Sequence, residues 1–274
     1  MGAFYRNRLL RRLLLPLFSR WNPGDVTIRH PWSDSPFRLH SFRHKGYWYH
    51  GRNRKKEVML LFPQLVRCGN FVIEIGGHIG WVAVYLAHLA GPDGRLVVFE
   101  PDPANLEYLR QNASGSGSIT VIGAAVCDDE GRTRLYRDLL SGQNSSVLAD
   151  YASSKAERRA PSRPPTHTEA MEVPCTTLDA YLRGARLGPP TFVKIDAEGA
   201  ELSILKGMRE TLHAEGLALM VEVTRNADEV HSLLSEAGFR LFRPDGSPVL
   251  APTMLRGNVF CIRPSDSRIE AWST

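Results

Sequence analysis

The chain has 274 residues, of which 43% are hydrophobic and 23% are charged. This length and composition fit one large α/β domain with additions, and they exclude a fibrous or a wholly disordered chain. The formal net charge is +5 at pH 7, a small basic excess that we interpret as a surface property rather than as a sign of an anionic partner.

Residues 1–54 are basic and aromatic without a clear hydrophobic period, and we expect them to cap the main domain. Five arginines and several leucines precede Asp25, but this apolar run is too short to cross a bilayer and Pro16 interrupts it. Three interpretations stay open: a basic amphipathic helix resting on an anionic membrane, a transit peptide, or a helix packed on the domain or another subunit, which we favour.

The four cysteines, Cys68, Cys127, Cys175 and Cys261, are far apart and include no C-x-x-C pair. Neither a zinc site nor a disulfide framework is therefore expected. The default compartment is the reducing cytoplasm, with peripheral membrane contact through the basic N-terminus as the alternative.

Short apolar runs alternate with helical patterns through most of the chain, beginning with an expected helix over residues 54–67. The expected strands are 71–75, 96–99, 119–122, 191–195, 217–223, 239–242 and 259–262. The expected helices between them are 79–90, 102–112, 200–212 and 228–237. This alternation predicts an α/β fold, a seven-stranded, mostly parallel sheet with helices on both faces. The last two strands have no helix between them, so the final strand is expected to run antiparallel.

Two segments interrupt this alternation. Residues 123–137 have the pattern of a small hairpin that turns at residues 129–131. Residues 141–175 are rich in Ser, Arg and Pro without a period, and we expect an active-site lid or a flexible insertion there. The expected organisation is a cap over 1–54, a main domain over 55–264 and a tail over 265–274.

The first group of candidate site residues lies where the first expected strand meets a helix. Glu74 precedes a turn that contains Gly76, Gly77 and Gly80. Glycines let the backbone approach a ligand closely, and ligands bind at the carboxyl ends of strands in open α/β sheets. The third glycine of a G-x-G-x-x-G motif would fall on Trp81, so the spacing suits S-adenosylmethionine (SAM), which has no pyrophosphate, better than a dinucleotide. A turn that only packs helix on strand is the alternative.

A second candidate, Glu100, ends the next expected strand and is followed by Pro101 and Asp102. A carboxylate at this place can accept hydrogen bonds from both ribose hydroxyls of a nucleoside. The alternative is an acid that only stabilises a helix start. Together the two motifs favour nucleoside binding, but they do not separate SAM from a nicotinamide cofactor.

A third group follows the fourth strand, where Asp196, Glu198 and Glu201 lie close together beyond Lys194. Carboxylates this close repel one another, and their pKa values rise unless something is bound between them. They could hold a base for a substrate hydroxyl, orient an amine or bind a metal. Glu201 alone fits the first turn of the next helix.

These motifs together resemble the FkbM-type methyltransferase family. The resemblance rests on the acidic-x-G-x-x-x-G turn, on residues 97–103, on Thr177-Leu178-Asp179 and above all on residues 192–207, and it covers roughly residues 55–262. It implies a Rossmann-like class I methyltransferase fold, and therefore a SAM-binding domain over 55–264. Members of the family typically methylate hydroxyl groups of sugars, glycolipids or polyketide-type natural products.

By this resemblance Glu74, Gly76, Gly80 and Glu100 would bind SAM, and Asp196 with Glu198 would line the reaction site. The full expected cofactor-binding set is Glu74, Gly76, Gly77, His78, Ile79, Gly80, Glu100, Pro101, Asn105, Ala125 and Asp196. The family usually has Asp in place of Glu74 and Gly-Ala-Asn in place of residues 76–78. These departures leave room for an altered or lost activity.

Methyl transfer to a hydroxyl needs alignment and a base for the proton. We expect Asp196 at the centre of the site, Glu198 next, and Glu222, which ends the following strand, as the third candidate. A divalent metal held by these three carboxylates is an alternative that we do not favour, so no metal ligands are assigned. Lys194 is expected to pair with a carboxylate, and His78 to belong to the cofactor loop rather than to act as a base.

The expected partner is a small-molecule or glycan acceptor, with its specificity set by the cap and by residues 141–175. Nucleic acid is not expected, because base amino methylation commonly uses Asn or Asp followed by Pro-Pro and an aromatic residue, whereas this chain has Asp-Ala-Glu-Gly. A nicotinamide-dependent oxidoreductase and a non-catalytic SAM-fold partner protein stay open as alternatives. The sequence does not set the oligomeric state.

Overall fold

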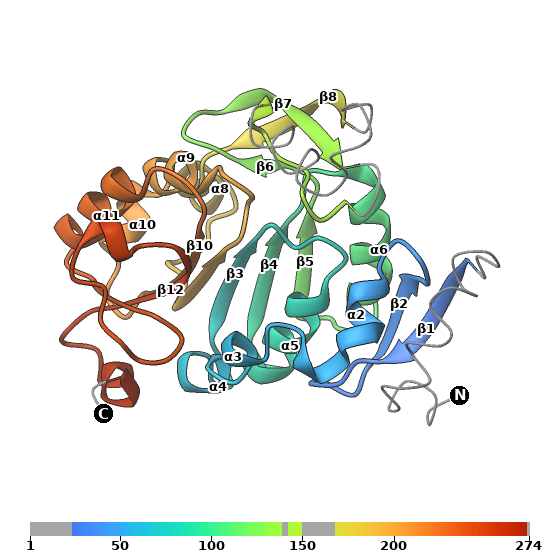
Figure 1. The fold of residues 1–274 in the computed structure, drawn as a ribbon, viewed down its shortest axis with the longest axis horizontal. Helices are drawn as coiled ribbons and strands as arrows, with labels where there is room; N and C mark the ends of the chain where they lie inside the picture. The colour runs from blue at the N-terminus through green and yellow to red at the C-terminus, as the bar shows by residue number, and fades with distance from the viewer. Residues whose placement is uncertain (1–23, 139–141, 150–167, 273–274) are drawn as a thin grey trace.

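The computed structural model describes residues 24–138, 142–149 and 168–272. A seven-stranded sheet with the order β11-β12-β10-β9-β3-β4-β5 forms its centre (Figure 1). Its strands are β3 (Phe71–Ile75), β4 (Arg95–Phe99), β5 (Ile119–Ile122), β9 (Phe192–Ile195), β10 (Ala218–Val223), β11 (Arg240–Phe242) and β12 (Gly257–Ile262). Only β12 runs antiparallel to its neighbours. The expected sheet, including its antiparallel last strand, is confirmed.

Helices cover both faces of this sheet because successive side chains of each strand point to opposite sides. Val72, Val98 and Phe192 pack with α5 (Trp81–Ala90), α6 (Pro103–Ala113) and the N-terminal segment. Their neighbours Ile73, Val97 and Val193 pack on the other face. The helices of that face are α8 (Leu178–Gly184), α9 (Glu201–Lys206), α10 (Arg209–Leu212) and α11 (Ala227–Glu236). Because both faces of the sheet are buried, the strand sequences are almost continuous runs of apolar residues.

Two helices expected to be continuous are each divided. The helix expected over 200–212 breaks between α9 and α10 at Gly207, where an added Cβ would lie 1.9 Å from the carbonyl oxygen of Cys127. The helix expected over 54–67 is divided into α3 (Lys56–Met59) and α4 (Phe62–Leu65). Pro63 lies in the first turn of α4, and because proline has no N–H it interrupts the hydrogen bonds of a longer helix.

A small three-stranded sheet lies above the carboxyl ends of the central strands (Figure 1). Its strands are β6 (Ala125–Val126), β7 (Gly131–Asp138) and β8 (Thr168–Thr176). The hairpin expected over 123–137 is wrong, because β8 lies between β6 and β7 and pairs with both. Local turn residues resembled a hairpin, whereas the true partner strand lies in the segment expected to be a lid. Of that segment, 142–149 is described as a loop, and 141 and 150–167 lie outside the described residues.

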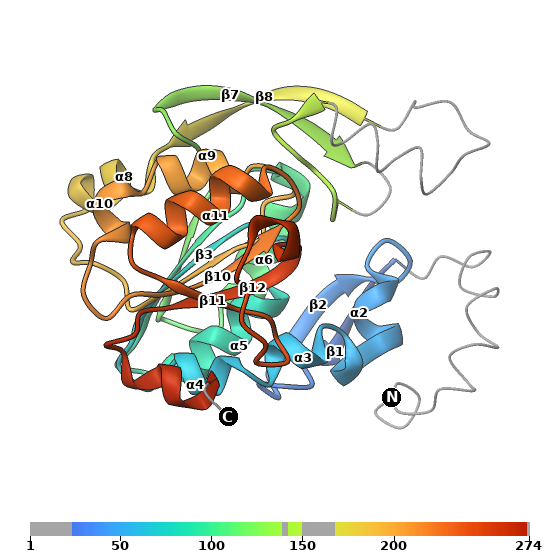
Figure 2. The same ribbon diagram turned by 60° about the vertical axis from the view of Figure 1, so that its left-hand side comes forward.

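The N-terminal segment packs beside α6 (Figure 2). It contains the antiparallel pair β1 (Asp25–Arg29) and β2 (Pro36–His40), the helix α2 (Lys45–His50) and the 3₁₀ turn η2 (Gly51–Asn53). The backbone N–H of Arg38 donates to Asn112 Oδ1 of α6 at 2.7 Å. The basic run before Asp25 lies outside the described residues, apart from Gly24. Within the described ranges, no helix is both long and hydrophobic enough to cross a membrane.

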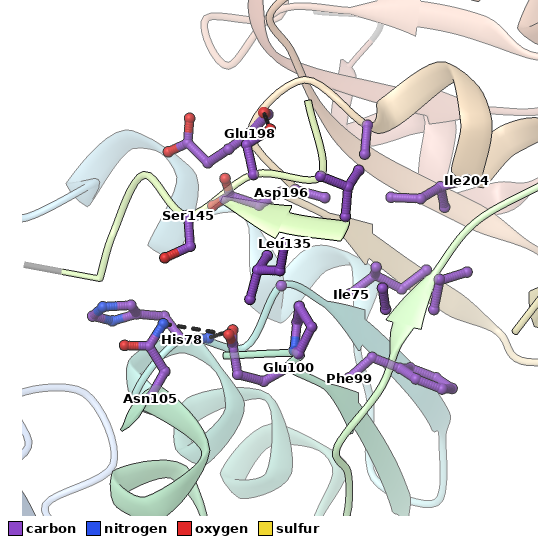
Figure 3. A pocket seen from close by; sticks show the side chains of 18 of the residues that line it. Ile75, His78, Phe99, Glu100, Asn105, Leu135, Ser145, Asp196, Glu198 and Ile204 are labelled. Carbon is purple, nitrogen blue, oxygen red and sulfur yellow. Dashed lines mark hydrogen bonds between the residues drawn. The ribbon is translucent and has the colours of Figure 1, made fainter. Parts of the chain in front are cut away.

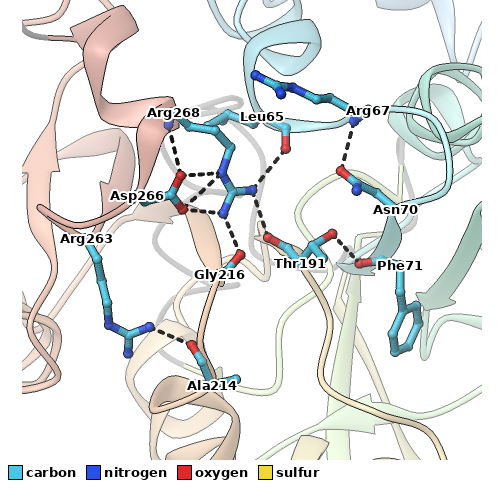
Figure 4. A network of polar contacts seen from close by, with 10 residues as sticks. All are labelled: Leu65, Arg67, Asn70, Phe71, Thr191, Ala214, Gly216, Arg263, Asp266 and Arg268. Carbon is cyan, nitrogen blue, oxygen red and sulfur yellow. Dashed lines mark hydrogen bonds and ion pairs between the residues drawn. The ribbon is translucent and has the colours of Figure 1, made fainter.

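Near the amino ends of β9 and β10, the C-terminal 3₁₀ helix η4 (Ser267–Trp272) contacts several elements. The guanidinium of Arg268 donates to the carbonyl oxygens of Leu65, Thr191 and Gly216 (Figure 4). Arg263 donates to the carbonyl oxygens of Leu212 and Ala214. These arginines therefore connect the end of α4 with the starts of β9 and β10.

Candidate functional site

Two adjoining pockets lie at the carboxyl ends of the central strands. The first pocket is lined by Phe99, Glu100, Asn105, Leu135 and Ile204, among others, and the second by Tyr47, Arg54, Lys55, Glu74 and Glu222. Both share Gly76, His78, Gln143, Asp196 and Glu198. Their empty volumes, including space open to solvent, are about 580 and 870 Å³.

The glycine turn after β3 borders both pockets, because Gly76 lines the two of them and Gly77 lines the second. An added Cβ on Gly76 would lie 2.0 Å from the carbonyl oxygen of Asp196, and one on Gly77 would lie 2.3 Å from Val98 Cγ1. Gly76 also has a φ of 85°, which L side chains rarely adopt. Only glycine therefore allows this close approach of β3 to β9.

Most residues of the expected cofactor set line at least one pocket. Glu74 and Gly77 line the second, Glu100, Pro101, Asn105 and Ala125 line the first, and Gly76, His78 and Asp196 line both. Ile79 and Gly80 line neither, because Ile79 is fully buried in the hydrophobic core and Gly80 caps α5.

Glu100 lies at the floor of the first pocket, across from Asp196 and Glu198 (Figure 3). Its Oε2 accepts from the backbone N–H of His78 at 2.7 Å, and its Oε1 accepts from the N–H of Asp102 at 2.9 Å and from Asn105 Nδ2 at 3.3 Å. Burial raises the pKa of Glu100 to about 7 although these donors oppose the rise. A ligand hydroxyl that donates to Glu100 would favour the ionised form.

A chain of alternating charges crosses the second pocket. Lys194 Nζ lies 2.9 Å from Glu74 Oε1 and 3.4 Å from Asp196 Oδ2. Lys55 Nζ lies 2.8 Å from Asp196 Oδ2 and 2.6 Å from Glu222 Oε2. The expectation that Lys194 pairs with a carboxylate is confirmed. Lys55 was not expected at the site, since it lies in a basic run that resembles a solvated helix face.

Strand geometry explains why these groups meet. Glu74 of β3 lies opposite Lys194 of the parallel strand β9. Ile195 of β9 lies opposite Val221 of β10, so Asp196 and Glu222, the next residues, follow at the same level. Side chains two apart on a strand point to the same face, so Glu74, Lys194, Asp196 and Glu222 all face the side covered by the N-terminal segment. Lys55 reaches them from that segment.

The lysines change the acidity expected for the acidic cluster. Burial would raise the pKa of Asp196, but the ammonium groups of Lys55 and Lys194 outweigh it and hold this pKa well below its usual range. Burial and the neighbouring Asp196 charge raise the pKa of Glu222, and burial raises the pKa of Glu74. A rise in the pKa was expected only if nothing lay between the carboxylates, and for Asp196 two lysines lie beside it and lower its pKa instead.

The other two acids of the motif lie apart. Glu198 lines both pockets. Glu201 lines neither pocket and is buried at the start of α9, where it accepts from the N–H of Gly199 at 2.7 Å and from Thr224 Oγ1 at 2.9 Å. This agrees with the helix-start interpretation of Glu201. In the described part of the chain, no group of three or more His, Cys, Asp or Glu side chains is arranged to hold a metal ion.

Unusual backbone conformations gather at the pockets. Lys55, His78 and Glu198 have φ values of 48°, 48° and 49°, in the left-handed region that residues other than glycine rarely adopt. Such conformations cost on the order of 1 kcal/mol or more and tend to cluster at functional sites. Together with the unpartnered Glu74 Oε2, which is buried, they mark this edge of the sheet as the candidate active site.

The loop over residues 142–149, part of the segment 141–175 that was expected to be an active-site lid or a flexible insertion, forms one wall of the site. Ser146 Oγ donates to the carbonyl oxygen of Glu198 at 2.7 Å, and Ser145 Oγ donates to Asp102 Oδ2 at 3.0 Å. Asn105 Nδ2 donates to the carbonyl oxygen of Gly142 at 3.1 Å. A long polar segment gave no pattern from which these contacts could be inferred.

Comparison with known proteins identifies the family of the chain. The sequence profile of the methyltransferase FkbM domain matches residues 74–241. The hexuronic acid methyltransferase AglP of Haloferax volcanii is 21% identical over 186 residues, which cover 67% of this chain and 69% of that protein.

Solved structures are similar at lower identity. The FkbM methyltransferase of Methylobacillus flagellatus is 17% identical with a TM-score of 0.45, and the match covers 70% of this chain but only 43% of that one. A putative rRNA methylase of Clostridium thermocellum is 12% identical with a TM-score of 0.45, over 76% of this chain and 94% of that one.

Proposed function

This chain belongs to the FkbM family of methyltransferases, and we propose that it transfers a methyl group from SAM to a hydroxyl of a sugar, glycolipid or natural-product acceptor. The observation that carries the proposal is the pair of connected pockets around one glycine turn, with Glu100 in one and Glu74 in the other. The first pocket is the proposed nucleoside side and the second is the proposed side of the methionine moiety and the acceptor.

The residues present fit SAM. Glu74 Oε2 is buried at the second pocket without a hydrogen-bond partner, and a buried carboxylate oxygen in this state calls for a donor such as the methionine amine. Glu100 already receives three hydrogen bonds from the protein. A carboxylate offers about four lone-pair positions, so we propose that it accepts one ribose hydroxyl rather than the two expected from the sequence.

When bound, SAM supplies an electrophilic methyl group, whose bond to sulfur breaks as the acceptor oxygen bonds to the carbon. The proton of the acceptor hydroxyl must then pass to a carboxylate of this chain. Asp196 is a poor proton acceptor because Lys55 and Lys194 stabilise its ionised form. Glu222 has the raised pKa and lies against Lys55 in the same pocket.

We therefore assign the proton acceptor to Glu222, ahead of Asp196 and Glu198. Environments that push the pKa values of two neighbouring acids apart are typical of catalytic pairs. Asp196 in this assignment stays ionised and holds the ammonium groups of Lys55 and Lys194 in place. Glu222→Gln should lower turnover by at least about 100-fold while the affinity for S-adenosylhomocysteine stays within about threefold.

The acceptor class draws support from the relative AglP, whose name gives it a hexuronic acid as substrate. A sugar acceptor also agrees with the polar lining of the second pocket, where carboxylates and cations offer both acceptors and donors to hydroxyl groups. The alternatives are a nicotinamide-dependent oxidoreductase and a SAM-fold protein without turnover.

The decisive test is calorimetric titration with S-adenosylhomocysteine. We expect micromolar-order affinity in the wild type, loss of binding in Glu100→Ala, and retained binding in the control Glu107→Ala, whose side chain lies on the exposed side of α6. A folded wild-type protein that binds a nicotinamide dinucleotide instead would overturn the proposal. Binding without turnover on any sugar acceptor would favour the non-catalytic alternative.

A further inference from the structure

Arg54 differs from the other cations that line the second pocket. Lys55 and Lys194 are each held by two carboxylates. Arg54 also lines this pocket, but among the described residues it forms no ion pair. Its side-chain hydrogen bond runs from one guanidinium nitrogen to Gln143 Oε1 at 3.2 Å. A guanidinium has five N–H donors, so most of its donor capacity stays available to a ligand.

The guanidinium is nevertheless held in a defined place. Its central carbon lies 4.1 Å from the centroid of the Tyr47 ring, a cation–π arrangement. The Tyr47 hydroxyl in turn lies 2.8 Å from His78 Nδ1, in the turn after β3. On the other side, an added Cβ on Gly46 would lie 3.0 Å from one guanidinium nitrogen, so the glycine leaves room for Arg54. A stacked arginine loses little further freedom when it binds a planar anion.

We propose that Arg54 binds a carboxylate of the acceptor and thereby selects acidic sugars over neutral ones. This inference rests on the proposed function, because it assumes that the second pocket holds the acceptor. The fork of a guanidinium matches a carboxylate with two parallel hydrogen bonds. Gln143, which accepts a hydrogen bond from Arg54, lines both pockets.

A guanidinium also binds phosphate, but the surrounding charges favour a carboxylate. Asp196, Glu198 and Glu222 line the same pocket, and a phosphate monoester with close to two negative charges would be repelled by them more than a singly charged carboxylate. Lys55 neutralises part of the charge of Asp196 and Glu222. This leaves Arg54 as the group with unmatched positive charge.

The positions of Arg54 and Gln143 in the sequence agree with the segments that were expected to determine acceptor specificity. The family profile begins at Glu74, so Arg54 lies in the segment before it. Gln143 lies within the segment 141–175, which was expected to be a lid or a flexible insertion. These two segments are the ones in which acceptor specificity was expected.

The test measures binding of simple sugars to the protein saturated with S-adenosylhomocysteine. By calorimetry or ligand-observed NMR, we expect the wild type to bind glucuronic acid at least tenfold more tightly than its methyl ester, which has the same ring without the charge. Arg54→Gln should abolish this preference, and Arg54→Lys should keep part of it. The matched control is Arg52→Gln, because Arg52 also lies over an aromatic ring, at 4.7 Å from the centroid of Trp32, but lines neither pocket.

Each outcome separates the two proposals. If S-adenosylhomocysteine does not bind, the proposed function fails. If it binds and glucuronic acid is no better than its ester, the Arg54 inference alone is overturned. Tighter binding of glucose 6-phosphate than of glucuronic acid would overturn the choice of carboxylate over phosphate. Should Arg54→Gln fold poorly, judged by circular dichroism and thermal unfolding, the wild-type preference and Arg54→Lys still decide whether the inference holds.

Discussion

Two groups of charged side chains lie at opposite ends of the strands of the central sheet, and they satisfy their hydrogen bonds in different ways. At the amino ends of the strands, Arg268 and Arg263 donate to backbone carbonyl oxygens, and Arg268 also donates to the carboxylate of Asp266 (Figure 4). At the carboxyl ends of the strands, the side chains from Glu74 to Glu222 pair charge with charge. Both groups line a pocket, so they differ in their hydrogen bonds and not in their access to a cavity.

A structural cluster of charges and a functional one can be distinguished by how far the protein itself satisfies their hydrogen bonds. The arginines at the amino ends of the strands already donate to backbone carbonyl oxygens and to Asp266, so a ligand would add few hydrogen bonds. At the carboxyl ends, Glu74 Oε2 has no partner and Arg54 has no ion pair among the described residues. Polar groups left partly satisfied beside a cavity indicate a binding site, because an unpaired buried group is costly unless a ligand completes it.

The largest expected effect is on stability, from Arg268→Ala. It removes the donor to the carbonyl oxygens of Leu65, Thr191 and Gly216. Since each unsatisfied carbonyl costs on the order of 1 kcal/mol or more, the free energy of unfolding should fall by about 3 kcal/mol, measured by urea denaturation. The affinity for S-adenosylhomocysteine should not change at temperatures where the variant is folded. A loss of binding without a loss of stability would remove the distinction between the two clusters.

The second effect is on cofactor affinity and depends on Glu100. Burial raises its pKa to about 7, and a donating hydroxyl binds the ionised form. Below pH 7, binding must therefore displace a proton, and the dissociation constant of S-adenosylhomocysteine should rise by up to about tenfold per pH unit. Above pH 7 it should level off. Calorimetry between pH 5.5 and 8 checks this, and the same slope in Glu100→Gln would show that another group is responsible.

A smaller effect is expected from Lys55→Met, which leaves Asp196 and Glu222 facing each other without their shared cation. The pKa of Glu222 should then rise further, because burial and the Asp196 charge act on it without an opposing cation, and a raised carboxylate pKa means that stability is lost as the pH rises. Because the three side chains are 18% to 30% exposed, the variant should be less stable than the wild type by only on the order of 1 kcal/mol at pH 8, with a smaller difference at pH 5. Thermal unfolding at the two pH values measures this difference. Lys56→Met, at an exposed position, should show no such trend.

The smallest effect is expected from Arg183→Ala. Arg183 lies 2.6 Å from Glu210, but the two side chains are 61% and 71% exposed. Because exposed ion pairs contribute little in water, the free energy of unfolding should change by less than about 0.5 kcal/mol in the same urea experiment. A change comparable to that of Arg268→Ala would mean that short ion-pair distances alone, rather than the partners of each charge, decide stability in this protein.

The sequence allowed the central sheet and several site residues to be predicted because their signals are local. Phe71 to Ile75 is a short apolar run that leads into a glycine turn, and Asp102 with Pro103 marks a helix start. Glu74 and Lys194 could be suspected as a pair, since a charge within a buried strand needs a partner. The three-stranded sheet was missed because β7 and β8 are separated by 29 residues, 139–167, that carry no hydrophobic period.

By itself, the sequence determined the alternation of strands and helices, the turn at Gly76 and the acids that end β4, β9 and β10, since each depends on neighbours in the chain. The position of Lys55 between Asp196 and Glu222, which are 141 and 167 residues away in sequence, depends on the folded chain. The tertiary structure also decided that Arg54 faces the same pocket. A run of basic residues has the same sequence pattern whether its side chains are solvated or paired with buried carboxylates. The pairing depends on distances in space and not on distances along the chain.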